Sequence, residues 1–212
     1  DNHNGIMILK DTLEKGQKLT SALSLKSDTI FDFDMTPNRG DCFSHLGVAR
    51  ELAIIENTKF KLGKVNFKSS KFSTQELIKV NVEDSKLCPR YSCRIIKNIK
   101  VQDSPKWLKN ELSILGHKSI NNIVDLANYV MFDTGQPLHT FDFDKLNGSI
   151  NIRCAKNKEE IVCLNNEKNK LSDNDIVIAD SNGPIAIAGV IGGLDSQVNS
   201  GTKNILLESA IF

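Results

Sequence analysis

His139 is the residue whose type and position best suit ligand binding or proton transfer. It follows Pro137 and Leu138 in a short arm, just after a predicted helix that carries Asn128 and Tyr129. Because a proline biases the residue before it away from helical dihedrals, the arm is predicted to be extended. Polar groups beside apolar ones at the end of a helix are typical of a pocket wall. A hydrogen-bonded structural histidine is the alternative interpretation.

Glu208 is a carboxylate within an apolar stretch, LLESA. A carboxylate in such surroundings is costly to bury unless hydrogen-bonding partners accompany it. Membership of a polar site therefore explains Glu208 better than core packing does.

Other motifs give weaker indications of chemistry. The GVIGG run at 189–193 lacks the G-x-G-x-x-G spacing and the βαβ context of a dinucleotide site. Ser44 and His45 are neighbours without an evident acidic partner, which argues against a nucleophilic triad. Asp32 and Asp34 fit the solvated face of a strand better than a metal pair. No metal site is predicted.

Composition excludes several classes of protein. The chain has 212 residues, 40% hydrophobic and 25% charged, which is typical of a globular protein with a sizeable core. Lys and Arg number 27 against 26 Asp and Glu, so any contact with RNA must be local. The helix expected over 39–56 carries both signs of charge, and no DNA binding is expected.

The five cysteines and the absence of a long apolar run favour a cytoplasmic location. Cys88 and Cys93 do not have the spacing of a zinc site, and an odd number of cysteines favours reduced thiols. No apolar run approaches the roughly 18 residues of a membrane span, and the start lacks the pattern of a signal peptide. We expect no membrane association.

Apolar residues recurring every three or four positions predict helices over 39–56, 104–116 and 120–134. Asn38 or Asp41 is expected to cap the first helix, and Ser104 to cap the second, with Pro105 in its first turn. Burial is predicted for two leucines on the apolar face of the second helix, Leu112 and Leu115.

Alternation of apolar and polar residues predicts strands, of which four are the clearest: 29–35, 77–82, 90–101 and 149–155. Short apolar runs follow at 161–164, 176–179 and 184–191, separated by residues typical of hairpin turns. Residues 57–75 are predicted to be a linker. The predicted fold class is α+β: a small strand-plus-helix unit, then a larger, mainly antiparallel sheet domain with helices.

Six motifs resemble one known family over essentially the whole chain. They are, in order, TPNRGDCFSHLGVARELA, SPKWL, NNIVDLANYVM, GQPLHTFD, AIAGVIGG and NILLESA. Together they are similar to the bacterial phenylalanyl-tRNA synthetase beta subunit. The resemblance implies that residues 1–70 contain the end of a tRNA-binding module (GIMIL at 5–9), a B1-like unit and a linker, and that residues 71–212 form a B3/B4-like editing domain.

The resemblance also implies the residues of an editing pocket. The family's histidine and glutamate that contact the ring hydroxyl of tyrosine match His139 and Glu208, and five further positions match pocket-lining residues: Asn128, Pro137, Leu138, Ala188 and Gly189. No catalytic side chain is assigned, and water is expected to be positioned in the pocket. The family commonly has threonine where this chain has Ala127, which removes a hydroxyl beside the pocket.

Editing has a physical rationale in such a family. An apolar pocket built for a phenyl ring rejects a ring with an added hydroxyl by only about a hundredfold. A second site that hydrogen-bonds the hydroxyl would remove tyrosine that is wrongly joined to tRNA-Phe. If His139 and Glu208 share one phenol hydroxyl, their segments must run side by side, although 69 positions separate them.

The implied assembly extends beyond this chain. The family pairs the beta subunit with an alpha subunit in a heterotetramer that binds tRNA-Phe, and the whole enzyme uses ATP and Mg²⁺, whereas no cofactor is expected in this stretch. The alternative hypothesis is a structural, tRNA-docking module with a vestigial pocket and no hydrolysis.

Overall fold

The computed structural model describes residues 6, 8, 9, 11–23 and 28–212. By its contacts the chain divides into two compact units, residues 1–34 and 35–212. The GIMIL stretch lies partly outside the described residues, and the division near residue 70 stays a prediction. In the described segments, no helix has the length and apolar character needed to cross a membrane.

Among its described residues, the first unit contains one short helix, α1 (Leu19–Ala22). The second unit contains helices and strands in mixed order. The helical elements are η1 (Gly40–Cys42), α2 (His45–Ile55), α3 (Thr74–Leu77), α4 (Lys106–Ile114), α5 (Asn122–Thr134) and η2 (Phe143–Lys145). The strands are β1 (Val80–Val82), β2 (Arg90–Ile96), β3 (His139–Asp142), β4 (Ile150–Cys154), β5 (Glu160–Val162), β6 (Lys168–Lys170), β7 (Ile176–Ala179), β8 (Pro184–Ile187), β9 (Ile191–Gly192) and β10 (Ile205–Ile211).

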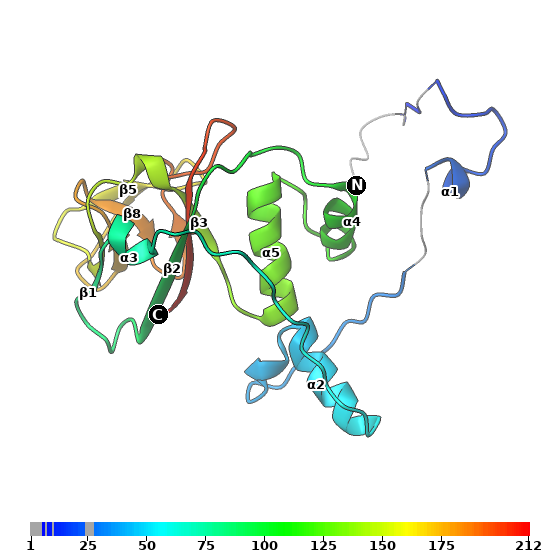
Figure 1. The fold of residues 1–212 in the computed structure, drawn as a ribbon, viewed down its shortest axis with the longest axis horizontal. Helices are drawn as coiled ribbons and strands as arrows, with labels where there is room; N and C mark the ends of the chain where they lie inside the picture. Colours follow the sequence, from blue (N-terminus) through cyan, green and yellow to red (C-terminus); the bar gives the residue numbers. More distant parts are fainter. Residues whose placement is uncertain (1–5, 7, 10, 24–27) are drawn as a thin grey trace. The chain divides into compact units, whose positions relative to one another are not determined.

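The strands form three sheets. Their orders are β1-β4-β7-β8-β9, β2-β10-β3 and β5-β6. The β1–β4 pair is parallel, and the other pairs among the described residues are antiparallel. Figure 1 shows β2 and the red C-terminal strand side by side. The predicted α+β class with a mainly antiparallel sheet domain is confirmed.

Two apolar clusters hold these sheets together. The larger one joins the three-stranded and five-stranded sheets, with Phe141 and Leu206 facing Ile152 and Ile178. The smaller one packs the β5–β6 hairpin against the other face of β7, around Cys163. All five cysteines are free thiols.

Helix α5 has well-defined ends, which place the arm that follows it. The side chain of Asn121 accepts hydrogen bonds from the first-turn amides, and Gly135 adopts a left-handed conformation (φ 78°) at the C-terminal end. The chain then turns into β3, which begins at His139. Figure 1 shows α5 near α4, and their contacts show that they pack together.

Three predictions about local structure are wrong. Residues 29–35 form no strand, because in the described part of the chain nothing pairs with them, and Phe31 and Phe33 are exposed. Ser44, rather than Asn38 or Asp41, caps α2, since its side chain accepts from the Gly47 amide. Residues 77–79 are not strand: α3 ends at Leu77, and β1 begins three residues later.

The predicted cap of α4 is also wrong, although the helix itself is confirmed. Pro105 takes the capping position, and Ser104 donates its hydroxyl to Asp125 instead. Leu112 is fully buried as predicted, whereas Leu115, just past the end of the helix, is only partly buried.

Candidate functional site

His139 and Glu208 lie directly opposite one another on adjacent antiparallel strands. Register pairs Glu208 of β10 with His139 of β3 on one side and with Cys93 of β2 on the other. Directly opposite side chains share a face, with Cβ atoms about 5 Å apart. The expected adjacency of the two segments is therefore confirmed. This row faces the interior between the sheets, because Leu206 and Phe141, two residues along each strand, belong to the larger core.

Glu208 is buried, with 6% of its surface exposed, and it has a hydrogen-bonding partner. Tyr91 of β2 donates its hydroxyl to Oε2 of Glu208 over 2.8 Å. A buried carboxylate without a partner would be strongly destabilising, so this bond explains how the core accommodates it. It is also a phenol–carboxylate contact of the kind expected for a bound tyrosine.

Burial shifts both ionisable groups of the pair toward their neutral forms. It raises the pKa of Glu208 to about 7, against the opposing effect of the Tyr91 hydrogen bond. It lowers the pKa of His139 to about 4. Between these two values, a carboxylic acid faces a neutral imidazole. Each group can then both donate and accept a hydrogen bond, which suits recognition of a hydroxyl.

The imidazole of His139 is held by close packing. Its ring meets that of Phe141 edge-on, with centroids 4.5 Å apart. On another side it meets the backbone of Gly192 in β9, where an added Cβ would lie 2.5 Å from Cε1 and 2.6 Å from Nε2. Only glycine allows β9 to approach so closely. The pair therefore lies where the three-stranded sheet meets the edge of the five-stranded sheet.

The other predicted pocket residues differ in how deeply they are buried. Ala188 is buried in the core shared with Phe141, whereas Gly189 is exposed near Phe212. Pro137 is exposed and Leu138 partly buried. Asn128 of α5 is partly buried, and its side chain makes no hydrogen bond within the described residues.

Two cavities of the second unit have linings that include neither His139 nor Glu208. One, of about 370 Å³, lies among residues of the β5–β6 hairpin and β8. The other, of about 1460 Å³, follows β2 and includes Tyr91 and Cys93 in its lining. The second cavity therefore reaches the residues that contact or neighbour Glu208.

Asp41, Cys42 and Glu51 form a group whose potential metal-binding atoms lie within 4.8 Å of one another. Arg39 already forms salt bridges with both carboxylates of this group, at 3.0 Å from Asp41 and 2.6 Å from Glu51. Its hydrogen bonds lower the pKa of Asp41 to about 2. Because a guanidinium occupies the position that a cation would take, we assign no metal there.

Tyr91, Cys93 and Gly192 were not predicted as site residues. The alternation in β2 placed Tyr91 and Cys93 on one face, which was the available signal. Their proximity to Glu208 depends on pairing between strands far apart in sequence, 117 positions for the Tyr91–Glu208 bond. No local pattern reports such a pairing.

The ionisation of Glu208 should make stability depend on pH. Its pKa of about 7 in the folded protein exceeds the ordinary value of 4.5, so the folded state binds more protons between these values. The stabilising contribution of the neutral acid is fully present below pH 4.5 and is lost as the pH rises through 7. The free energy of unfolding falls by on the order of 3 kcal/mol over this range.

Glu208→Gln removes this ionisation. We therefore expect the free energy of unfolding of the variant, relative to the parent, to increase from about pH 4.5 to pH 8. Urea titrations at several pH values measure it. His139 has the opposite pH dependence, since its stabilising contribution is lost as pH falls toward 4, but it is present in both proteins and largely cancels. A difference that stays constant with pH would contradict the shifted pKa.

Sequence similarity identifies the class of protein. Residues 87–212, more than half of the chain, match the B3/4 domain family, and the chain belongs to that family.

Similar proteins include beta subunits of phenylalanine–tRNA ligase. The one from Fusobacterium nucleatum is 46% identical over 98% of this chain, and the one from Protochlamydia amoebophila is 44% identical over 99%. This chain spans only 26% of the length of each. An N-terminal fragment of the Pyrococcus horikoshii phenylalanyl-tRNA synthetase beta subunit aligns over 82% of this chain and 52% of its own, with a TM-score of 0.49 and 20% identity.

Proposed function

We propose that this chain is the editing part of a phenylalanine–tRNA ligase beta subunit, and that it hydrolyses tyrosine wrongly attached to tRNA-Phe. The observation that carries the proposal is the pairing of buried Glu208 with His139 across β10 and β3. The names of the relatives and the B3/4 family support the same assignment.

Selection of tyrosine follows from the chemistry of the pair. A phenol hydroxyl donates one hydrogen bond and accepts another, and the carboxyl and imidazole groups together satisfy it. Phenylalanine would leave these polar groups unpaired, at a cost of roughly 1–3 kcal/mol for each. The editing site therefore favours tyrosine, the amino acid that the apolar aminoacylation site rejects poorly.

Hydrolysis in this proposal depends on positioning. In the proposed pocket, the side chain of Asn128 and the backbone amide of Gly189 orient the ester and a water molecule, since the Ala188 amide already donates to the carbonyl of Ile176. The terminal ribose hydroxyl of the tRNA assists the attack. None of these residues is assigned as a nucleophile.

The remaining parts of the proposed enzyme lie outside this chain. An alpha subunit would carry the aminoacylation site, with ATP and Mg²⁺ serving there, and tRNA-Phe would be the shared partner. The present residues would remove the errors made by that site.

A direct test uses the intact ligase that contains this chain, together with its partner subunit. Preformed tyrosyl-tRNA-Phe and phenylalanyl-tRNA-Phe are incubated with it, and the loss of each ester is followed. We expect tyrosine to be released at least about a hundredfold faster, because the site hydrogen-bonds the hydroxyl that phenylalanine lacks. Release of both esters at the rate seen in buffer would overturn the proposal.

A second candidate function is a tRNA-docking module without hydrolysis. Two observations favour it: Ala127, buried on α5, lacks the hydroxyl that the family commonly has, and neither cavity described above is lined by His139 or Glu208. Tight tRNA binding without ester hydrolysis would select this candidate.

A further inference from the structure

The cavity along β2 has an uneven distribution of charge. Four cationic side chains line it, and no carboxylate does: Lys68, Lys79, Arg94 and Lys97. All four residues are exposed, and within the described residues none of them makes a salt bridge. The nearby acid Glu76 accepts a hydrogen bond from the Ser73 amide as part of the cap of α3. For a chain of net charge +1, this is a local concentration of positive charge.

Two phenylalanines of the linker lie against two of these cations. The guanidinium of Arg94 lies 4.6 Å from the ring centroid of Phe67, and the ammonium of Lys97 lies 6.0 Å from that of Phe72. Both rings are more than half exposed, at 62% and 66%. Exposure of an aromatic ring to water is unfavourable, and covering the ring with a stacked partner is favourable. These two exposed rings are therefore available for stacking.

The size and position of this cavity indicate what it binds. At about 1460 Å³ it exceeds the roughly 300–1000 Å³ of ordinary small-molecule sites. Unpaired cations beside exposed aromatic rings are the features by which proteins hold single-stranded nucleic acid, since cations bind phosphates and rings stack on bases. Tyr91 lines the cavity and also bonds Glu208, so the cavity follows the strand beside the proposed editing pair.

We infer that this groove, defined by Phe67, Lys68, Phe72, Lys79, Arg94 and Lys97, binds the single-stranded 3′ end of the tRNA. The inference rests on the proposed function for the identity of the RNA. The groove holds the strand along β2, the neighbour of the strand that carries Glu208.

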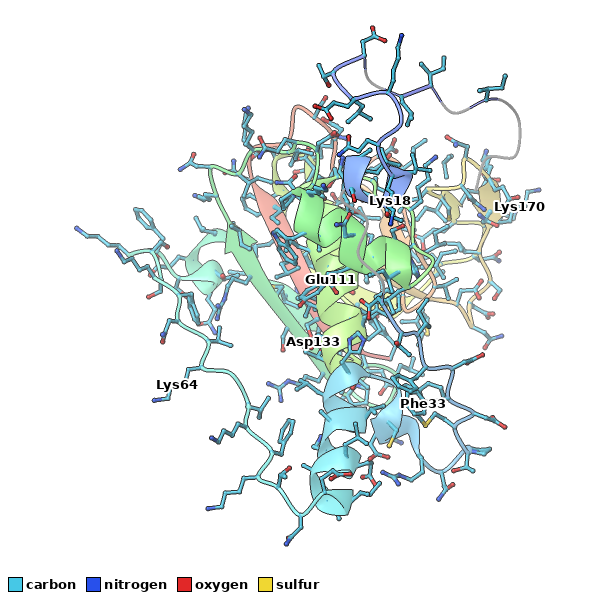
Figure 2. The ribbon with its side chains drawn as sticks, turned by 90° about the vertical axis from the view of Figure 1, so that its right-hand side faces the viewer. Lys18, Phe33, Lys64, Glu111, Asp133 and Lys170 are labelled. Atoms are coloured by element: carbon cyan, nitrogen blue, oxygen red, sulfur yellow. The ribbon has the colours of Figure 1, made fainter. Side chains whose placement is uncertain are left out.

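The test measures binding of an unacylated, fluorescently labelled single-stranded RNA ending in CCA to the intact ligase, at several salt concentrations. The groove variant is Arg94→Ala/Lys97→Ala. The matched control is Lys118→Ala/Lys170→Ala, which removes the same charge at exposed positions outside the groove. Figure 2 shows Lys170 with its side chain projecting from the β5–β6 hairpin.

We expect the groove variant to bind about tenfold more weakly and its salt slope to fall by about 1.4, as for two lost phosphate contacts. Phe67→Ala should weaken binding at least about fivefold while leaving the salt slope unchanged, because it removes stacking and no charge. The control should bind like the parent.

A 4-thiouridine in the same RNA identifies the groove independently by photocrosslinking. Crosslinks to peptides within residues 67–98 are expected. Crosslinks confined to other parts of the ligase, or a groove variant that binds like the control, would overturn the inference. Because the RNA carries no ester, groove-dependent binding without tyrosine hydrolysis would leave this surface assigned while the editing proposal failed.

Discussion

Replacing His139 by alanine in the intact ligase is expected to slow hydrolysis of tyrosyl-tRNA-Phe by about 10- to 100-fold, while charging with phenylalanine is nearly unchanged. The lost imidazole leaves the tyrosine hydroxyl with one partner fewer in a buried site, at a cost of about 1–3 kcal/mol. Charging is spared because the proposal places that chemistry on another subunit. Tyrosine-charged tRNA should therefore accumulate during charging in the presence of tyrosine.

The control for this variant is His117→Ala. His117 is exposed, and its ring packs edge-on against Phe132, with centroids 4.8 Å apart, outside the row of Cys93, Glu208 and His139. It should leave both activities unchanged. If His139→Ala reduced charging and hydrolysis equally, His139 would be a residue that holds the fold, the alternative interpretation of a histidine after a proline.

Asp125→Ala is expected to have the largest effect on stability, about 4 kcal/mol. Asp125 is fully buried on α5 and accepts from the hydroxyls of Ser104 and Ser119, each at 2.5 Å, and from the Ile120 amide at 2.9 Å. Alanine would leave these three donors without their acceptor. Because α5 leads into the arm that carries His139, the change should also loosen the site.

The pKa of Asp125 supports this expectation. Burial acts to raise the pKa, but hydrogen bonds from Ile120, Ser104 and Ser119 outweigh it and lower the pKa below its ordinary value. Because the pKa of the Asp125 carboxyl is lowered by folding, the carboxylate stabilises the fold at any pH above its ordinary pKa. This stabilisation is lost as the pH falls through the pKa of the folded state.

Urea unfolding of the parent, Asp125→Ala and Asp125→Asn measures the effect. Asparagine keeps one acceptor oxygen and should lose only about half as much stability. Glu111→Ala serves as the surface control, since Glu111 is exposed on α4 (Figure 2) and alanine is a good helix former. A loss for Asp125→Ala no larger than for this control would show that the three hydrogen bonds are dispensable.

Elements with strong local signals were predictable from the sequence. Helix α5 was predicted with its end at Gly135, because a long periodic pattern ends at a residue that readily adopts positive φ. Strand β7 was predicted with its bounds, because a short apolar run lies between turn residues.

Predictions failed where tertiary partners decide the structure. The alternation of residues 29–35 indicates an extended segment with two different faces, but it carries no information about a neighbouring strand. Among the described residues, no strand pairs with this segment. Ser104 was expected to cap α4, a local role, yet its hydroxyl bonds Asp125, 21 positions away. A residue that can satisfy either a local or a distant partner cannot be assigned from spacing alone.

The candidate site was only partly predictable for the same reason. The resemblance supplied His139 and Glu208, and the chemistry required them to meet. Tyr91 and Gly192 depend on register between strands and on the approach of β9, which only the fold fixes. Whether Ala127 weakens hydrolysis stays a prediction for the editing assay.

We propose that Glu208 and His139 distinguish tyrosine from phenylalanine by the ring hydroxyl. The most direct measurement is the ratio of hydrolysis rates for tyrosyl-tRNA-Phe and phenylalanyl-tRNA-Phe, compared between the intact ligase and its Glu208→Gln variant. At pH 8, above the raised pKa of about 7 where Glu208 is a carboxylate, we expect this ratio to fall about tenfold, because a neutral amide accepts a phenol proton less strongly than a carboxylate, with little change in the phenylalanine rate. A ratio unchanged by the substitution would show that Glu208 does not select tyrosine.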